Sequence, residues 1–437
     1  MPKNGLFERL KNDIEKKLMR GFHDKKKGIG ITYDDIYLIN GARTPFGKLC
    51  GTLGQVSPTD LGIYATRAAI EKSGITGEDI DQLMYANIGQ SSADSYFLPR
   101  HIGLYSGIPE GIPAVMLQRI CGSGFETIIA GAEQIALGKA NTALCGGTEN
   151  MTLSPTVSFG NRMGYPLGKI DFKDMLWEAL NDTAAVPMGC TAENVAVKHN
   201  ITKAEANEFA KQSVDKYLAA KERGFFDDEV IKMNSTVFEV EGLNPRKVRL
   251  DRKVIDFTTD ENVRPSDLES MAKLPSVFAR DGVQTAANSS GIVDGAASVV
   301  VAKKEFVESK GLKPLSRIVA SATSALDPRV MGLGPVPSIR LVLEMAGLTL
   351  ADIGLIEINE AFAAQFLGCE KELGLNRDIC NVNGGAIALG HPLAATGTRL
   401  SLTISREMKN RGVRYGIASA CIGGGQGTAV LFENMNA

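Results

Sequence analysis

The sequence predicts an α/β fold in which one unit occurs twice, with a long insertion between the two copies. Short apolar strands alternate with amphipathic helices from about residue 34 onwards. This alternation is typical of a mainly parallel sheet covered by helices on both faces. Ordered motifs also recur at a nearly constant separation along the chain, whereas the stretch 152–291 has no counterpart in the second copy.

Composition excludes several classes of protein. The chain has 437 residues and a net charge of −2, which argues against a nucleic-acid groove as its purpose. No apolar run reaches the ~18 residues that cross a bilayer. The seven cysteines form no Cys-x-x-Cys pair, so neither a disulfide framework nor a zinc ribbon fits. With no signal peptide recognised, these features predict a cytoplasmic protein whose special cysteines are reactive, and no bound metal.

Residues 1–30 form a basic arm with nine basic and four acidic side chains. Leu6, Leu10 and Ile14 recur every four residues, so positions 5–22 predict an amphipathic helix. A helix packed on the protein's own core, or a mobile tail, is favoured over an arm that docks a membrane surface or a partner. Organelle targeting is disfavoured because transit peptides avoid acidic residues.

The first copy opens with an apolar strand over 36–39. A helix follows over 61–72, where apolar side chains have helical spacing and Ser73 with Gly74 provides the C-terminal stop. Residues 83–88 return to strand character.

The second copy repeats these features in order. The segments 71–76 and 344–349 correspond, and an aspartate follows each, at 79 and at 352. Strands that end in Cys-Gly-Gly at 145–147 and Cys-Ile-Gly-Gly at 421–424 extend the series. We therefore place the domains as follows: the N-terminal half at 31–151 plus 292–312, the insertion at 152–291 and the C-terminal half at 313–437.

The insertion contains one clear helix. Thr202 and Glu205 form a capping box at its start, and Gly224 ends it. Because insertions on a rigid scaffold commonly carry recognition loops, we expect the substrate to contact this segment.

Two candidate site residues lie in corresponding turns of the two copies. Cys121 follows a strand over 115–117 and precedes a helix that begins near Phe125, a position where the helix dipole favours a thiolate. His391 lies in the Gly- and Pro-bounded loop 383–392, directly before another helix. Taken singly, each residue could equally be a buried structural side chain. The repeat, however, predicts that the two loops meet at the junction of the halves.

Two further sites follow later motifs. Asn359 and Glu360 come directly after the apolar strand 353–358, at the end of the strand where open α/β sheets place ligands. Cys421 opens a Gly-rich turn over 421–427 whose backbone N–H groups are suited to an oxyanion hole. Phosphate-loop, dinucleotide and metal motifs are incomplete, since no Gly-Lys pair is followed by Ser or Thr and the four histidines are scattered.

In this order the motifs resemble the thiolase family. The match is carried by Cys-Gly-Ser-Gly at 121–124, Asn-Glu-Ala-Phe-Ala at 359–363, Gly-Gly-Ala-Ile-Ala-Leu-Gly-His-Pro at 384–392 and Cys-Ile-Gly-Gly-Gly at 421–425. The resemblance covers the chain from about residue 34 to the end. It implies a thiolase-like duplicated α/β unit, with two pseudo-symmetric halves layered α-β-α-β-α and 152–291 as an inserted, CoA-binding loop domain.

The resemblance implies an acyltransferase of fatty acid metabolism. Thiolases cleave 3-ketoacyl-CoA with free CoA, as in β-oxidation, or condense acetyl-CoA to acetoacetyl-CoA. By this likeness Cys121 carries the acyl group, His391 takes its proton, and Cys421 is the second acid and base. The N–H groups of Cys121 and Gly423 would hold the acyl oxyanion, and His391 with a water on Asn359 the enolate oxygen.

The resemblance also implies CoA as a substrate, no cofactor, and a homodimer or homotetramer. Arg264, Met188, Phe278 and Ser290 match the family's CoA-contacting positions. Two residues beside Asn359 are assigned to the same site, Ala361 and Phe362.

Departures from the family pattern are mild. Ala394 and Thr396 replace a Gly and a Ser that many members carry, and Gln118 replaces an Asn. Pro187 stands where short-chain acetoacetyl-CoA thiolases tend to have His, which resembles the degradative 3-ketoacyl-CoA type.

Chain length and direction are left open. Two alternatives also stay open: an inactive acyl-CoA-binding scaffold that docks a partner through the arm, and a ketosynthase-type enzyme, which lacks a cysteine equivalent to Cys421.

Overall fold

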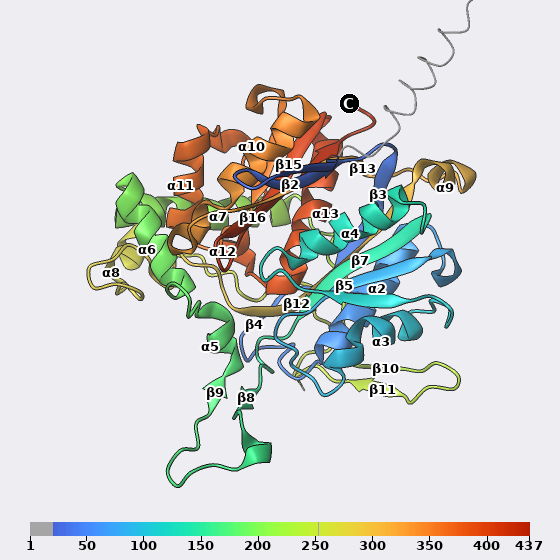
Figure 1. The fold of residues 1–437 in the computed structure, drawn as a ribbon, viewed down its shortest axis with the longest axis horizontal. Coiled ribbons are helices and arrows are strands. Elements are labelled where there is room, and N and C mark those ends of the chain that lie inside the picture. The colour runs from blue at the N-terminus through green and yellow to red at the C-terminus, as the bar shows by residue number, and fades with distance from the viewer. Residues whose placement is uncertain (1–20, 252) are drawn as a thin grey trace, which may run out of the picture.

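The computed structural model describes residues 21–251 and 253–437, and Figure 1 shows two αβ halves with the insertion beside them. The elements of the N-terminal half are β3 (Ile36–Arg43), β4 (Gly47–Lys48), α2 (Pro58–Lys72), β5 (Gln82–Ala86), α3 (Leu98–Tyr105), β6 (Ala114–Leu117), α4 (Ser123–Ala136), β7 (Thr142–Glu149), β12 (Val293–Lys303) and α9 (Lys304–Ser309). Those of the C-terminal half are β13 (Ser316–Ala325), α10 (Pro335–Ala346), β14 (Leu355–Ile358), α11 (Ala363–Leu373), α12 (Ala386–Leu389), α13 (Leu393–Arg411), β15 (Tyr415–Ile422) and β16 (Gln426–Glu433). The strands predicted near 36 and 83 and the helix over 61–72 are confirmed.

The two halves repeat one another element by element. β5 and β14 begin at Gln82 and Leu355, and β7 and β15 begin at Thr142 and Tyr415, so both pairs of strands have the same separation along the chain. The helical turns Gly77–Asp79 and Leu350–Asp352 keep this separation too, and each begins with a reciprocal Thr–Asp capping box.

The strands form a mixed sheet in the order β14-β15-β16-β13-β3-β12-β7-β5-β6. β5 lies parallel to β6 and β7, and β14 lies parallel to β15. The prediction of a mainly parallel sheet is wrong, because the last strand of each half, β12 or β16, runs antiparallel to both neighbouring strands of its half. In the C-terminal half the cause is the turn 423–425, since so short a connection between β15 and β16 can join only antiparallel strands.

Helices cover and separate the strands in three layers. α4 and α13 pack against each other in the middle of the molecule (Figure 1) and share one apolar core with strands of both halves. α2 and α3 cover the outer face of the N-terminal half, and α10 and α11 cover that of the C-terminal half. The predicted α-β-α-β-α layering is confirmed.

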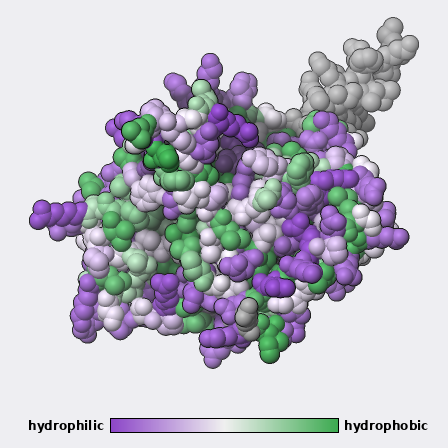
Figure 2. Space-filling view, turned by 90° about the horizontal axis from the view of Figure 1, so that it is seen from below, coloured by the Kyte–Doolittle hydropathy of each residue, from purple (hydrophilic) through white to green (hydrophobic). Residues whose placement is uncertain are grey.

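The insertion divides into a helical part and a projecting part. Its elements are β8 (Thr156–Val157), β9 (Lys173–Asp174), α5 (Met175–Leu180), α6 (Met188–His199), α7 (Lys203–Glu222), β10 (Thr236–Phe238), β11 (Arg246–Val248) and α8 (Leu268–Lys273). The helix predicted after Thr202 is confirmed as α7, capping box included, and it packs on α11 and α12. β8, β9 and α5 extend below the body (Figure 1), and large apolar side chains such as Phe159 and Met163 are exposed there. Seen from below, apolar residues lie among hydrophilic ones on this face (Figure 2).

The basic arm lies mostly outside the described residues, which begin at Gly21. The predicted helix over 5–22 is wrong at its end, because Gly21 and Phe22 belong to β1 (Gly21–Asp24), which forms a hairpin with β2 (Gly28–Thr32). β2 pairs with β13, so the chain joins the sheet before β3 begins. Membrane or partner contact by the arm stays a prediction. Among the described residues no helix has both the length and the apolar character needed to cross a membrane.

Candidate active site

Cys121 lies in a tight turn between β6 and α4. Ile120, directly before it, adopts the left-handed backbone conformation with φ 42°, and the N–H of Arg119 donates to Oγ of Ser123 at 2.8 Å. The Cys121 side chain is only 3% exposed. Burial raises the pKa of this thiol to about 11, the N–H of Gly423 opposes the rise, and the charge of Glu149 adds to it.

The thiolate predicted at Cys121 is therefore wrong for the resting protein. The N–H groups of Gly122 and Ser123 donate to the carbonyls of Arg119 and Ile120, at 2.9 and 3.1 Å. Because these first N–H groups are already bonded, they are not free to stabilise a negative sulfur. Cys121 is a buried thiol that needs a base to become a nucleophile.

His391 is a buried, neutral imidazole held in one tautomer. Its Nδ1 lies 2.6 Å from Oγ1 of Thr396, and that hydroxyl donates to the carbonyl of Pro392 at 3.1 Å. Since the hydroxyl proton is used, Nδ1 must carry the hydrogen, which makes Nε2 the acceptor nitrogen of the ring. Burial, with the charge of Arg399, lowers the pKa of His391 to about 3.

Asn359 and His391 lie side by side. Nδ2 of Asn359 is 3.3 Å from Nε2 of His391, and the Oδ1 atom of Asn359 is buried with no partner among the described residues. The residue directly follows β14, and its N–H donates to the carbonyl of Ser419 in β15. The predicted placement at the carboxyl end of a strand is confirmed, and an unpartnered buried oxygen points to a bound water or ligand.

Cys421, near the end of β15, and Gly423, directly after it, lie beside Cys121. Cys421 is fully buried, and burial together with the nearby sulfur of Cys121 raises the pKa of its thiol well above the ordinary value. A Cβ on Gly423 would lie 2.3 Å from Cε of Met188, and Gly424 and Gly425 have φ of 83° and 80°. Only glycine fits such a turn without strain, which explains the Gly-rich motif.

The structure therefore brings together the five residues for which we predicted a catalytic role. Cys121 comes from the turn before α4 in the N-terminal half. The other four come from the C-terminal half and complete the site: Asn359, His391, Cys421 and Gly423. The site lies where the α4 and α13 ends of the two halves meet, as the repeat predicted.

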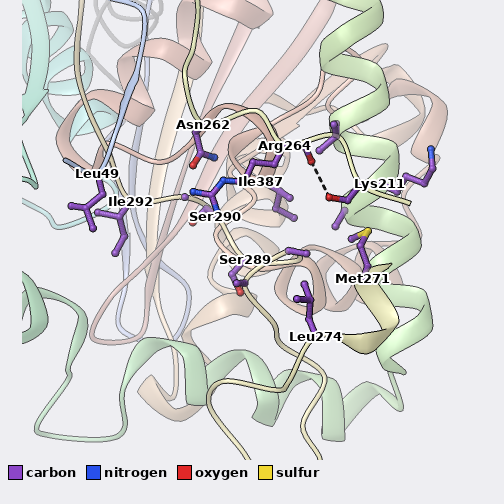
Figure 3. Close-up of a pocket in the computed structure, with 16 residues that line it drawn as sticks. Leu49, Lys211, Asn262, Arg264, Met271, Leu274, Ser289, Ser290, Ile292 and Ile387 are labelled. Atoms are coloured by element: carbon purple, nitrogen blue, oxygen red, sulfur yellow. Dashed lines mark hydrogen bonds between the residues drawn. The ribbon is translucent and has the colours of Figure 1, made fainter. Parts of the chain in front are cut away.

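A cavity of about 450 Å³ opens between the insertion and the halves. Figure 3 shows Asn262, Arg264 and Ser290 grouped on one wall, with Lys211 of α7 and Met271 of α8 on another. Two of the residues that line the cavity, Gly291 and Ile292, contact residues for which we predicted a catalytic role. The carbonyl of Gly291 accepts from the N–H of His391 at 3.0 Å, and Ile292 packs in one cluster with Cys121.

Of the six residues predicted to bind CoA, Arg264 and Ser290 line this cavity. Three others lie deeper, where they pack around Cys421: Met188, Ala361 and Phe362. Phe278 supports that group edge-on, with its ring 5.8 Å from the ring of Phe362. These four side chains do not line the cavity and instead form or support an apolar wall near the second cysteine.

Three residues near the site escaped the sequence reasoning. Lys211 faces the cavity from the middle of α7, and only its helical position relative to Ala210 and Val214 could have indicated this. Arg399 is buried on α13 and its charge acts on His391. Glu149 ends β7 and its charge acts on Cys121; its place at a strand end was the one available signal.

Within 21–251 and 253–437, no group of three or more His, Cys, Asp or Glu side chains is arranged to hold a metal ion. All seven cysteines are free, Cys121 and Cys421 included.

Comparison with known proteins agrees with this geometry. Residues 36–305 match the family model described as the N-terminal domain of thiolases, and residues 312–434 match that of the C-terminal domain. The chain belongs to the thiolase family. It is an acyltransferase of the thiolase class, and neither the inactive scaffold nor the ketosynthase alternative receives support.

Several thiolases are similar over nearly the whole chain. The mitochondrial 3-ketoacyl-CoA thiolase of Bos taurus is 42% identical over 402 residues, which cover 91% of this chain and 98% of the bovine one. The acetyl-CoA acetyltransferase of Syntrophomonas wolfei is 39% identical over 91% of this chain and 99% of its own. The crystal structure of the human mitochondrial 3-ketoacyl-CoA thiolase in complex with CoA matches with a TM-score of 0.86 at 41% identity, over 92% of this chain and 98% of the human one.

The predicted cytoplasmic location is wrong by this comparison. The similar proteins from Bos taurus, Homo sapiens and Mus musculus are all named as mitochondrial thiolases. The prediction relied on the acidic residues of the arm and on the lack of a recognisable signal peptide, and composition of this kind is a weak guide to destination.

Proposed function

We propose that the protein cleaves 3-ketoacyl-CoA with free CoA to acetyl-CoA and a shortened acyl-CoA. The observation that carries this proposal is the meeting of two buried thiols, Cys121 and Cys421, next to the loop of the neutral base His391: Cys121 packs against Leu393, two residues after His391. One thiol can hold the acyl group while the other moves protons, which a single cysteine cannot do. Pro187 before α6 and the 42% identity to a 3-ketoacyl-CoA thiolase favour cleavage over condensation of acetyl-CoA.

The first half-reaction transfers the acyl group to the protein. Nε2 of His391 takes the proton of Cys121, whose sulfur bonds to C3 of the substrate. The C2–C3 bond then breaks, and the acyl group stays on Cys121 as a thioester. The electron pair of the broken bond stays on C2 as the enolate of acetyl-CoA, and C2 takes a proton from Cys421. The N–H groups of Gly423 and Cys121 stabilise the oxyanion on C3. A water on Oδ1 of Asn359, with protonated His391, stabilises the enolate oxygen.

The second half-reaction releases the product. The Cys421 thiolate takes the proton of the CoA thiol, and the CoA sulfur attacks the thioester carbonyl. The bond from the acyl carbon to Cys121 breaks, and the Cys121 sulfur recovers its proton from His391. Both cysteines return to the thiol form that their burial favours.

CoA enters this scheme as a substrate, and no cofactor is required. The cavity beside His391 is suited to the pantetheine chain, and the positive side chain of Arg264 lines the same cavity as a partner for phosphate groups, whereas the ammonium of Lys211 is paired with Asp215 at 2.6 Å. The apolar wall of Met188, Ala361 and Phe362 then faces the reacting end of the substrate.

We further propose that the protein is a homodimer or homotetramer. β6 ends the strand order of the sheet, and its Val115 is 37% exposed, so an edge is available for pairing with a second copy. Light scattering on the full chain tests this, and a monomer mass at micromolar concentration would contradict it.

A turnover series tests the reaction. We expect thiolysis of 3-ketoacyl-CoAs of increasing chain length to consume CoA and release acetyl-CoA. Cys121→Ser should abolish turnover with an unchanged circular dichroism spectrum, whereas Cys50→Ser, at an exposed cysteine, should match the wild type. Retained turnover in Cys121→Ser, or no thiolysis of any chain length by the wild type, would refute the proposal.

A further inference from the structure

Glu149 is a buried carboxylate beside the catalytic residues that the proposed reaction does not use. It is the last residue of β7 and is 1% exposed. Among the described residues it makes no ion pair and accepts only from neutral donors. Oε1 accepts from the N–H of Gly89 at 2.8 Å and from Nδ2 of Asn87 at 3.1 Å, and Oε2 accepts from the N–H groups of Ala394 at 3.2 Å and Ile88 at 3.3 Å.

These four donors come from two different halves of the molecule. Asn87, Ile88 and Gly89 follow β5 in the N-terminal half, whereas Ala394 lies in the first turn of α13, three residues after His391. The end of β7 also touches that turn directly, since a Cβ on Gly147 would lie 1.9 Å from the carbonyl oxygen of Ala394. Glu149 therefore fastens the helix that follows His391 to the half that carries Cys121.

The internal repeat shows that packing alone does not require an acid here. The counterpart of Glu149, at the separation that relates the two halves, is Ile422 at the end of β15. Ile422 lies against the start of α4, where a Cβ on Gly122 would be 2.4 Å from its Cδ1. β7 and β15 thus end in equivalent places, each against the central helix of the other half. Ile422 contacts the start of α4, which follows Cys121, and Glu149 contacts the start of α13, which follows His391.

The charge of Glu149 also reaches Cys121. It is one cause of the raised pKa of that thiol, and burial raises the pKa of Glu149 itself to about 7. The titratable groups that face Glu149 are Cys121, from the turn before α4, and Asp294, from β12; the contacts from α13 and from residues 87–89 are neutral.

We propose that Glu149 is a positioning residue for the thiolase reaction, whose carboxylate holds the first turn of α13 and so keeps His391 in place opposite Cys121. The same turn contains Thr396, which fixes the His391 tautomer, so a shift of the turn moves the base and its anchor together. The inference rests on the proposed function. It adds a residue that touches neither the substrate nor the reacting atoms.

Two substitutions separate the hydrogen bonds of Glu149 from its charge. Glu149→Gln removes the charge and puts an amide group where two acceptors are needed. Glu149→Asp keeps the charge on a side chain one methylene too short to reach both Ala394 and residues 87–89. Because either change loosens the turn, we expect kcat for thiolysis to fall about tenfold or more in both. The KM for CoA should stay within about twofold, because Glu149 does not line the CoA cavity.

The pH dependence of Cys121 alkylation distinguishes the proposed role from a merely structural one, because loss of structure alone would not shift its midpoint. The rate of iodoacetamide labelling of the Cys121 peptide, followed by mass spectrometry against pH, reports the apparent pKa of the thiol. In Glu149→Gln we expect its midpoint to fall by about half a pH unit or more, because a negative charge that opposes the thiolate is gone. In Glu149→Asp the midpoint should stay near that of the wild type.

The matched control is Glu407→Gln. Glu407 is also a buried carboxylate, but it lies near the C-terminal end of α13, where it pairs with Arg411 and Arg223. We expect the substitution to leave kcat and the alkylation midpoint unchanged. Wild-type kcat in either Glu149 variant, or an unchanged alkylation midpoint in Glu149→Gln, would overturn the proposal. Absence of thiolysis in the wild type would refute the proposed function instead, while the alkylation profiles would still test the effect of Glu149 on Cys121.

Discussion

At the scale of single residues, the site is defined by groups that burial keeps uncharged. His391 is neutral and presents Nε2, while Cys121 and Cys421 are both thiols, so the resting site holds no separated charge between them. In the proposed reaction, charge appears only when the proton of Cys121 moves to His391. In a buried site the oxyanion and the imidazolium form close together, where each stabilises the other more strongly than it would in water.

Replacing Thr396 by valine should disable the base without removing it. Valine has nearly the same shape but cannot accept the hydrogen of Nδ1, which then remains buried and unbonded. We expect kcat to fall about tenfold or more, because the imidazole loses both its tautomer and its orientation. Thr396→Ser keeps the hydroxyl and should stay close to wild type. Steady-state thiolysis measures both, and equal kcat for valine and serine would show that the hydroxyl is not needed.

His391 should also make the protein sensitive to acid. Its pKa is about 3 in the folded protein against 6.5 ordinarily, so as pH falls the unfolded chain takes up the proton first. The stability that comes from keeping this residue neutral is complete above pH 6.5 and is lost progressively as pH falls toward 3. Between pH 6.5 and 5 the loss is about 2 kcal/mol.

Urea unfolding of wild type and His391→Asn at several pH values measures this loss. Several carboxyls have a raised pKa, among them Glu149, Asp294 and Glu357, and they stabilise the folded state as pH falls; they do so in both proteins and cancel in the difference. The free energy of unfolding of the wild type should therefore fall relative to that of the variant as pH decreases. Parallel curves would contradict the effect assigned to His391.

At the scale of elements, the site depends on how closely α4 and α13 approach. A Cβ on Gly124, in the first turn of α4, would lie 2.5 Å from the backbone nitrogen of Thr398 and 2.8 Å from the carbonyl oxygen of Ala394. Backbone meets backbone there, so neither helix can yield by turning a side chain. The same contact sets the separation of Cys121 and His391, each of which lies directly before one of these helices.

Gly124→Ala should therefore force the two helices apart. We expect the free energy of unfolding to fall by about 3 kcal/mol, which is the cost of overpacking in a rigid core. Gly111→Ala is the matched control, because a Cβ there meets nothing within 4 Å. Urea titration compares the two variants, and equal midpoints would show that α4 and α13 can separate without cost.

At this scale the sequence predicted the features that depend on neighbouring residues or on the internal repeat. The capping box of Thr202 and Glu205 marked the start of α7, and the repeat placed Cys121 and His391 in facing turns. The antiparallel entry of β12 between β3 and β7 was not predictable, since the whole insertion separates β12 from both of its pairing partners in the sequence. Nor was the ionisation of Cys121, because burial and the bonds of its neighbours outweigh the helix dipole.

At the scale of the whole molecule, a buried polar network joins the insertion to both halves. Arg43, at the end of β3, donates to Glu229 at 2.5 Å and to both oxygens of Asp260 at 2.7 and 2.9 Å. Thr403 of α13 donates to Glu229 at 2.8 Å, and Tyr217 of α7 donates to Asp260 at 2.9 Å. The insertion, which lines the cavity proposed for CoA, is thus fixed to the scaffold by charge as well as by apolar packing.

Arg43→Ala should loosen this attachment throughout the molecule. The arginine is fully buried, so its removal leaves the carboxylates of Glu229 and Asp260 without a cation, which costs about 3–5 kcal/mol. We expect lower stability in urea and protease cleavage within 225–262 before the rest of the chain. Arg414→Ala, which removes the exposed partner of Glu433, should change neither. If the two variants resisted urea and protease equally, the insertion would be held by its apolar contacts, and the buried network would have no structural role.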